Sequence, residues 1–127
     1  HNLIIETPGD TIVIIQSYPL EMGIDLKALS REFSESAAHS IPLGSINKSV
    51  FSKRTKQWGY DWIAEDFESV FLGEAIPHKR LYGSKEVGES QIFLILQVPA
   101  EDYQIVEKGF HLIVNSLSGD SKKNKNL

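Results

Sequence analysis

The stretch that most constrains the fold of this chain is a strand-and-helix unit between residues 90 and 117. Residues 91–98 form a short apolar run that stops at Pro99, and such a run is typical of a strand covered on both faces. After Pro99, which suits the first position of a helix, apolar side chains recur at helical spacing on one side. The unit therefore predicts a buried strand that leads into a long amphipathic helix ending at Gly119. The apolar side of this helix consists of Tyr103, Val106, Phe110, Ile113, Val114 and Leu117.

Two more strands and a second helix are predicted before this unit. Residues 2–6 and 11–18 are rich in β-branched and apolar side chains, and the turn signal Thr7-Pro8-Gly9-Asp10 separates them. Asp25 is a good N-cap for a helix over 26–38, in which charged side chains occupy the side opposite the apolar stripe. The stripe consists of Leu26, Leu29, Phe33 and Ala37.

The middle of the chain predicts a loop and three further strands. Residues 39–47 form the loop, and strand-like alternation begins at Lys48. A turn or bulge at Trp58-Gly59-Tyr60 leads to a second strand, whose apolar parity switches and so predicts a bulge or break near Glu65 and Asp66. Residues 75–82 predict a third strand, and the glycine-bearing residues 83–89 predict a hairpin loop.

This order of elements predicts the fold class. Consecutive strands joined by short turns form a mostly antiparallel sheet, and amphipathic helices cover such a sheet. We therefore expect an α+β fold, an α/β/α sandwich with a mostly antiparallel central sheet flanked by two main helices. The chain has 127 residues and no internal repeat, so we expect a single domain over residues 1–118. Residues 119–127 are polar and are expected to form a flexible tail.

Composition argues against several kinds of function. The net charge of −4 argues against a nucleic-acid partner, because phosphate binding requires a clustered basic surface. The absence of cysteine excludes a thiol nucleophile and a cysteine-ligated zinc site. No apolar run approaches the roughly 18 residues of a membrane span. The chain begins at His1, and a removed signal peptide or lipoprotein anchor is one expectation for its N-terminus.

Sequence motifs indicate no catalytic residue, no cofactor and no metal site. The four histidines lack ligand spacing, and neither a G-x-S-x-G elbow nor a glycine-rich phosphate loop is present. An acidic run is expected to lie on a solvated face; it consists of Asp61, Glu65, Asp66 and Glu68. A composite site that joins His39 and His78 to acids distant in sequence remains an alternative.

An aromatic cluster is the best candidate for a recognition surface. Trp58 and Trp62 are the two tryptophans of the chain, with Tyr60 and Asp61 between them. They either form a cross-strand aromatic ladder within the sheet or present a recognition surface, since Trp and Tyr dominate interface hot spots. Basic residues near the cluster in sequence would form its rim: Lys53, Arg54, Lys56, His78, Lys79 and Arg80. The predicted binding residues are Trp58, Tyr60, Asp61, Trp62, His78 and Arg80.

Three helical residues also lead to structural expectations. Gly109 within the last helix costs about 1 kcal/mol relative to alanine. Close approach of that helix to the sheet would explain it, and a hinge is the alternative. His111 adjoins the apolar stripe and is expected to be a packed or rim residue. His39 is expected to cap the end of the first helix.

Several features together carry a resemblance to a known family. They are Gly59-Tyr60-Asp61 within a long strand, the strand over 76–82, the apolar strand 91–98, Pro99-Ala100-Glu101-Asp102-Tyr103, and a helix that ends Val114-Asn115-Ser116-Leu117. In this pattern the chain resembles the PsbP-like superfamily, which includes photosystem II extrinsic proteins, yeast Ran-binding proteins and bacterial DcrB-type lipoproteins. That family often ends the helix with Ser-Phe, where this chain has Ser116-Leu117. The resemblance covers most of residues 3–118 and implies an α/β/α sandwich that acts by binding.

We therefore expect a non-catalytic binding or assembly module with a protein partner. An extracytoplasmic location, in the periplasm, the thylakoid lumen or at the cell surface, is the expectation that goes with this resemblance. One alternative is an intracellular regulator that binds a small GTPase, as the Ran-binding relatives do. Another is a metal-dependent enzyme with a composite site of His78 and the acids of the Asp61 to Glu68 run.

Overall fold

The chain folds around an antiparallel sheet of seven strands, as a computed structural model shows for residues 2–7, 11–39 and 44–126. The strand order is β1-β2-β7-β6-β5-β3, and β4 also pairs with β5. Single 3-10 turns, Leu20–Met22 and Ala100–Asp102, precede the two helices. The elements are β1 (Asn2–Thr7), β2 (Thr11–Pro19), α1 (Leu26–His39), β3 (Gly44–Phe51), β4 (Thr55–Gln57), β5 (Tyr60–Phe71), β6 (Glu74–Val87), β7 (Ser90–Pro99) and α2 (Tyr103–Asn126).

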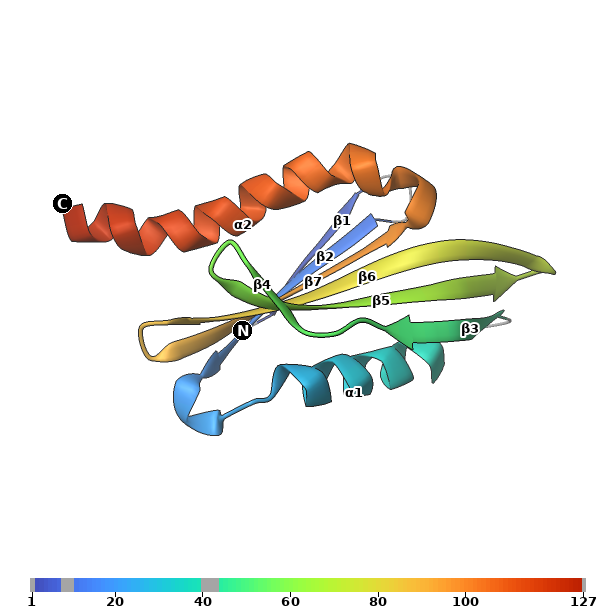
Figure 1. Cartoon of the computed structure of the whole chain (residues 1–127), viewed down its shortest axis with the longest axis horizontal. Helices are drawn as coiled ribbons and strands as arrows, with labels where there is room; N and C mark the ends of the chain where they lie inside the picture. The colour runs from blue at the N-terminus through green and yellow to red at the C-terminus, as the bar shows by residue number, and fades with distance from the viewer. Residues whose placement is uncertain (1, 8–10, 40–43, 127) are drawn as a thin grey trace.

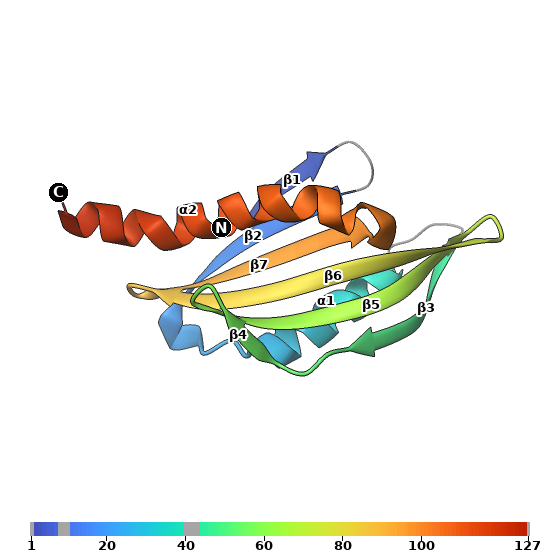
Figure 2. The same cartoon turned by 45° about the horizontal axis from the view of Figure 1, so that its top comes forward.

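The two helices lie on opposite faces of the sheet (Figure 1). The turned view in Figure 2 shows α2 across one face and α1 behind the other. Every strand pairing within the described ranges is antiparallel. The arrangement confirms the predicted α/β/α sandwich.

Each face of the sheet carries its own apolar core, and β7 contributes to both. Phe93 and Ile95 point toward α1, whereas Leu94 and Leu96 point toward α2. This alternation confirms that the apolar strand is covered on both faces. The buried core beneath α2 consists of Val13, Tyr60, Trp62, Leu94, Leu96, Phe110 and Val114. The buried core beneath α1 consists of Leu26, Ile63, Tyr82, Phe93 and Ile95.

Both predicted helices form, and their apolar stripes face the sheet. Asp25 caps α1 as predicted, because its Oδ2 accepts a hydrogen bond from the Ala28 amide at 3.0 Å. Pro99 lies just before the 3-10 turn, and α2 continues past Gly119 to Asn126. The predicted helix end at Gly119 is therefore wrong, while the flexibility of residues 119–127 stays a prediction. Within the described ranges, neither helix is long and apolar enough to cross a membrane.

Strand β6 is longer than predicted, and the hairpin loop expected over 83–89 is wrong. The strand continues to Val87, and a turn at Gly88 and Glu89 connects it to β7. Gly83 lies in the strand opposite Trp62 of β5. A β-carbon at Gly83 would collide with three carbons of the Trp62 ring. The glycine therefore marks a close side-chain approach and not a loop.

The bulge expected near Glu65 and Asp66 is also wrong. Strand β5 keeps an unbroken register with β6 from Asp61 to Phe71. Its apolar parity switches because both faces are covered: Tyr60 and Trp62 pack beneath α2, while Ile63 packs beneath α1. The irregularity lies instead in β3, where the register shifts between Asn47 and Val50.

Gly109 does not approach the sheet, so the explanation predicted for it is wrong. The residue is exposed, and a β-carbon placed there would have no atom within 4 Å. The packing of α2 against the sheet therefore does not require a glycine at this position.

Candidate binding site

The aromatic half of the predicted binding surface packs beneath α2. The rings of Tyr60 and Trp62 lie 5.5 Å apart, and the Trp62 ring contacts Phe110 edge-on at 5.8 Å. Both side chains are buried, with 1% and 7% exposure. These rings therefore make their contacts in the core between β5 and α2.

Trp58 lies at the edge of the same cluster. It occupies the turn between β4 and β5 with φ of 57°, a left-handed conformation that is uncommon for a bulky residue. Its half-buried ring lies 4.2 Å from the His111 ring and 6.0 Å from the Trp62 ring. His111 of α2 is therefore a rim residue that packs against Trp58, as predicted.

The other predicted binding residues face α1. Asp61 and Arg80 each lie two residues along the strand from Ile63 and Tyr82, which belong to the core beneath α1, and so share their face of the sheet. Asp61 forms an ion pair of 2.8 Å with Arg54, and Arg80 is 1% exposed. The structure thus divides the six predicted residues between two faces of the sheet and does not join them in one surface. Their role in binding stays a prediction.

A buried polar network lies at the centre of the α1 face. Arg80 Nη1 donates to Glu65 Oε1 at 2.8 Å, and the Tyr82 hydroxyl donates to the same oxygen at 2.7 Å. Arg80 also donates from Nε and Nη2 to Gln97 Oε1, at 2.9 Å and 2.6 Å. The guanidinium lies 4.4 Å from the centre of the Phe67 ring. The buried charge of Arg80 is thus paired and hydrogen-bonded.

The second oxygen of Glu65 links α1 and β3 to β5. Glu65 Oε2 accepts hydrogen bonds from the hydroxyls of Ser34 and Ser49. Burial opposes ionisation of Glu65, but these bonds, the Tyr82 hydroxyl and the charge of Arg80 outweigh it and lower the pKa of the carboxyl. Burial, together with the bond to Glu65, raises the pKa of Tyr82 far above its ordinary value.

The expectation that Glu65 lies on a solvated face is therefore wrong. Glu65 shares its parity with Ile63 and Phe67, which are both buried. This shared parity with apolar residues is the sequence signal from which burial of the Glu65 side chain could have been predicted.

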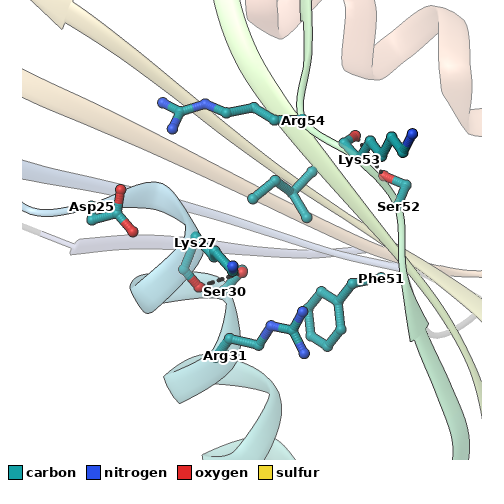
Figure 3. Close-up of a pocket in the computed structure, with 9 residues that line it drawn as sticks. Asp25, Lys27, Ser30, Arg31, Phe51, Ser52, Lys53 and Arg54 are labelled. Carbon is teal, nitrogen blue, oxygen red and sulfur yellow. Dashed lines mark hydrogen bonds between the residues drawn. The ribbon is translucent and has the colours of Figure 1, made fainter.

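A strongly charged hollow lies between α1 and the segment that joins β3 to β4. We call it the α1–β3 pocket; it has a volume of about 380 Å³. Figure 3 shows side chains of α1 on one side of it and residues 51–54 on the other. Ser52 holds this segment to β5, because its amide donates to Ala64 O at 2.8 Å and its Oγ accepts from Ala64 N at 2.9 Å. The lining residues are Asp25, Lys27, Ser30, Arg31, Phe51, Ser52, Lys53, Arg54 and Ile63.

The charges around this pocket are unbalanced. Its lining includes four cations, Lys27, Arg31, Lys53 and Arg54, and a single acid, Asp25. Arg54 is paired with Asp61. Among the residues that the structure describes, no acid lies within 4.0 Å of the charged groups of Lys27, Arg31 and Lys53. The pocket is therefore a site of positive potential that favours an anionic group.

Only part of this site could be predicted from the sequence. Lys53 and Arg54 were expected to form a rim for the tryptophans, but they lie across from Lys27 and Arg31 of α1. The charged side of α1 was expected to be simply solvated. No local sequence pattern predicts that α1 lies beside residues 51–54, because the two segments are distant from each other in the sequence.

The described residues contain no group of three or more His, Cys, Asp or Glu side chains suited to a metal ion. Within the composite site considered above, the Glu65 carboxylate is already bonded to Arg80 and Tyr82. His78 Nδ1 donates to the Ile76 carbonyl at 2.9 Å. The side chain of His39 lies outside the described residues, so its capping role stays a prediction.

Comparison with known proteins gives structural similarities at low sequence identity. No protein-family model and no curated protein matches the chain. The fold is similar to that of PA94 from Pseudomonas aeruginosa, a protein of unknown function, with a TM-score of 0.45 and 12% identity over 89% of this chain and 76% of that one. It is also similar to that of cyanobacterial PsbP from Synechocystis sp. PCC 6803, with a TM-score of 0.49 and 12% identity over 80% of this chain. This chain spans 62% of the cyanobacterial protein, which bears the name of the superfamily that the sequence resembles.

Proposed function

We propose that this chain is a non-catalytic binding module that recognises an acidic segment of a partner protein at the α1–β3 pocket. The observation that supports this most is the concentration of Lys27, Arg31, Lys53 and Arg54 around one hollow of a chain whose net charge is −4. A local reversal of the overall charge attracts an oppositely charged partner and orients it during encounter.

The chemistry of the pocket fits carboxylates that flank an apolar side chain. The Arg31 guanidinium lies 3.9 Å from the centre of the Phe51 ring (Figure 3), which holds its donors in a fixed orientation. A guanidinium held in this way binds a carboxylate with two parallel hydrogen bonds. Phe51 and the buried Ile63 provide apolar surface between the cations. An acidic peptide offers both kinds of contact, whereas an inorganic anion offers one.

The test is a titration of the ¹⁵N-labelled protein with an acidic peptide of seven glutamates and one central leucine, followed by backbone NMR shifts. We expect the shifts to concentrate at residues 25–31 and 51–54 and to weaken as salt is added, because exposed charges are screened. The double variant Lys27→Glu/Lys53→Glu should bind about tenfold more weakly, since each exposed ion pair is worth up to about 1 kcal/mol.

The matched control is Lys48→Glu/Lys108→Glu, which changes the net charge equally at exposed sites away from the pocket. Equal loss of binding in both double variants would show a general charge effect and would contradict the proposal. Inorganic phosphate that binds as tightly as this leucine-containing acidic peptide would also contradict it, because the pocket would then select charge alone. The extracytoplasmic location stays a prediction, which the gene sequence upstream of His1 tests.

A further inference from the structure

A second hollow lies on the same face of the sheet, near the C-terminal half of α1. It has a volume of about 390 Å³, within the range of about 300–1,000 Å³ for small-molecule sites. Its apolar walls come from Ile12, Phe33, Ile46 and Phe67. Arg80, His78 and Gln97 line it as well, and we call it the Arg80 pocket. It shares no lining residue with the α1–β3 pocket.

The polar groups of the Arg80 pocket are fixed by bonds to the protein. Gln97 Oε1 accepts two hydrogen bonds from Arg80, so the oxygen is occupied and the amide group keeps its two N–H donors for other partners. His78 donates from Nδ1 to the Ile76 carbonyl, so Nε2 of the neutral imidazole is an acceptor. Ser36 and Ser69 add two hydroxyls to the lining. Gln97 thus presents two oriented N–H donors, and the two hydroxyls can donate as well.

The charge in this pocket is already balanced. Arg80 is 1% exposed and Glu65 is 0% exposed, and their ion pair is 2.8 Å long. The guanidinium also lies 4.4 Å and 5.2 Å from the ring centres of Phe67 and Phe33. A ligand with several negative charges finds no excess of positive charge here. A ligand with one neutral acceptor head matches the donors without leaving a buried charge unpaired, and a single carboxylate adds only one charge beside the Arg80 guanidinium.

We propose that the Arg80 pocket binds a small organic molecule with an aromatic or aliphatic body and a single carboxylate or amide head. The body packs against Phe33, Phe67 and the two isoleucines. The head accepts hydrogen bonds from Gln97 Nε2 and from the serine hydroxyls. A cationic head is rejected, because the Arg80 guanidinium of like charge lies beside it.

Three probes with the same body test this assignment: phenylacetate, phenylacetamide and phenethylamine. Each is titrated at millimolar concentration into the ¹⁵N-labelled protein, and the backbone shifts are mapped. We expect phenylacetate and phenylacetamide to shift residues 33–37, 67–69, 78 and 97, and phenethylamine to leave them unchanged. Shifts from none of the probes, or equal shifts from all three, would overturn the proposal.

Two variants separate recognition of the head from filling of the pocket. Gln97→Glu keeps an oxygen for Arg80 but removes the amide donors and adds a negative charge, so phenylacetate binding should fall by roughly tenfold or more, the effect of one lost charge-assisted hydrogen bond. Ser69→Phe fills the hollow and should abolish binding of both probes, whereas Ser116→Phe on the exposed side of α2 should not. Thermal melting of each variant shows that it is folded. A folded Ser69→Phe protein that binds as the parent does would place the ligand elsewhere and refute the assignment.

Discussion

The indole of Trp62 lies directly over Gly83 on the neighbouring strand, so close that a β-carbon at Gly83 would collide with three of its ring carbons. Trp62 is itself held by the Gln57 carbonyl, which accepts a hydrogen bond from its Nε1 at 2.9 Å, and by the edge of Phe110. The ring cannot move aside without losing these contacts. The pair therefore fixes how β5, β6 and α2 pack together.

We predict that Gly83→Ala destabilises the protein by about 1–3 kcal/mol or more, the cost of overpacking a filled core. Urea unfolding followed by tryptophan fluorescence measures the change. A variant as stable as the parent would show that the indole has room to shift.

Gly109→Ala should have the opposite effect and serves as the matched control. Gly109 lies in the interior of α2 and an added β-carbon there meets no atom within 4 Å. Alanine removes the entropic cost of glycine, so we expect a gain of about 1 kcal/mol in the free energy of unfolding. The same urea titration measures it. A loss of stability would point to a role for the glycine as the predicted hinge or as a contact surface.

Removing the charge of Glu65 should be the most damaging of these changes. Glu65→Gln leaves Arg80 buried without its partner, and we expect a loss of about 3–5 kcal/mol. The double variant Glu65→Gln/Arg80→Met should lose less than the sum of the two single losses, because it removes both charges. Strict additivity in the double-mutant cycle would show that the pair is not coupled.

The same carboxyl makes stability depend on pH. Its pKa is lower in the folded state than the ordinary value of about 4.3. Ionised Glu65 thus contributes its full stabilisation above the unfolded-state pKa, and this contribution is lost as the pH falls through the lower folded-state pKa. We expect the free energy of unfolding to decline below about pH 5, and to decline less steeply in Glu65→Gln. Parallel pH profiles for the two proteins would rule out this carboxyl as the source.

Two hairpin turns offer a direct comparison of backbone strain. Trp58-Gly59 and Leu72-Gly73 both have two positive φ values, 57° and 79° in the first and 51° and 82° in the second, as a type I′ turn requires. Leu72 is 80% exposed at the β5–β6 turn, which lies at one tip of the sheet (Figure 2). Asn tolerates this conformation, so Leu72→Asn should stabilise the protein by about 1 kcal/mol. Thermal unfolding measures the gain.

Trp58→Asn makes the same change at the equivalent turn position and should instead destabilise the protein. Its indole packs on His111 and Trp62, and the lost packing outweighs the relief of strain. Stabilisation by both substitutions would show that the Trp58 ring contributes little to holding α2.

The parts of the fold that could be predicted from sequence depend on local patterns. The Asp25 cap, the apolar stripe of α2 and the doubly covered β7 each involve residues close together in the chain, and their spacing reports burial directly. The hairpin loop was misplaced because a glycine in a strand and a glycine in a turn look alike until Trp62 is known to lie over Gly83.

The candidate sites were harder to predict, because their residues meet only through the fold. The four bonds to Glu65 come from α1, β3 and β6, and no spacing in the sequence links these elements. In a strand covered on both faces, an acid next to polar residues looks solvated even when it is fully buried. For the same reason, the cations of α1 were assigned to a solvated side of that helix, and Lys53 and Arg54 to the rim of the tryptophan cluster.

The carboxylate of Glu65 also lies between the two proposed pockets. Ser34 is in α1 between Arg31, which lines one pocket, and Ser36, which lines the other; Ser49 of β3 likewise lies between Ile46 and Phe51. Both serines donate to the same oxygen of Glu65. A ligand that moves α1 away from β3 at one pocket therefore strains these two hydrogen bonds, which also hold the walls of the other pocket in place. Thermodynamic linkage then requires reciprocity: whatever factor one ligand applies to the affinity of the second, the second applies to the first.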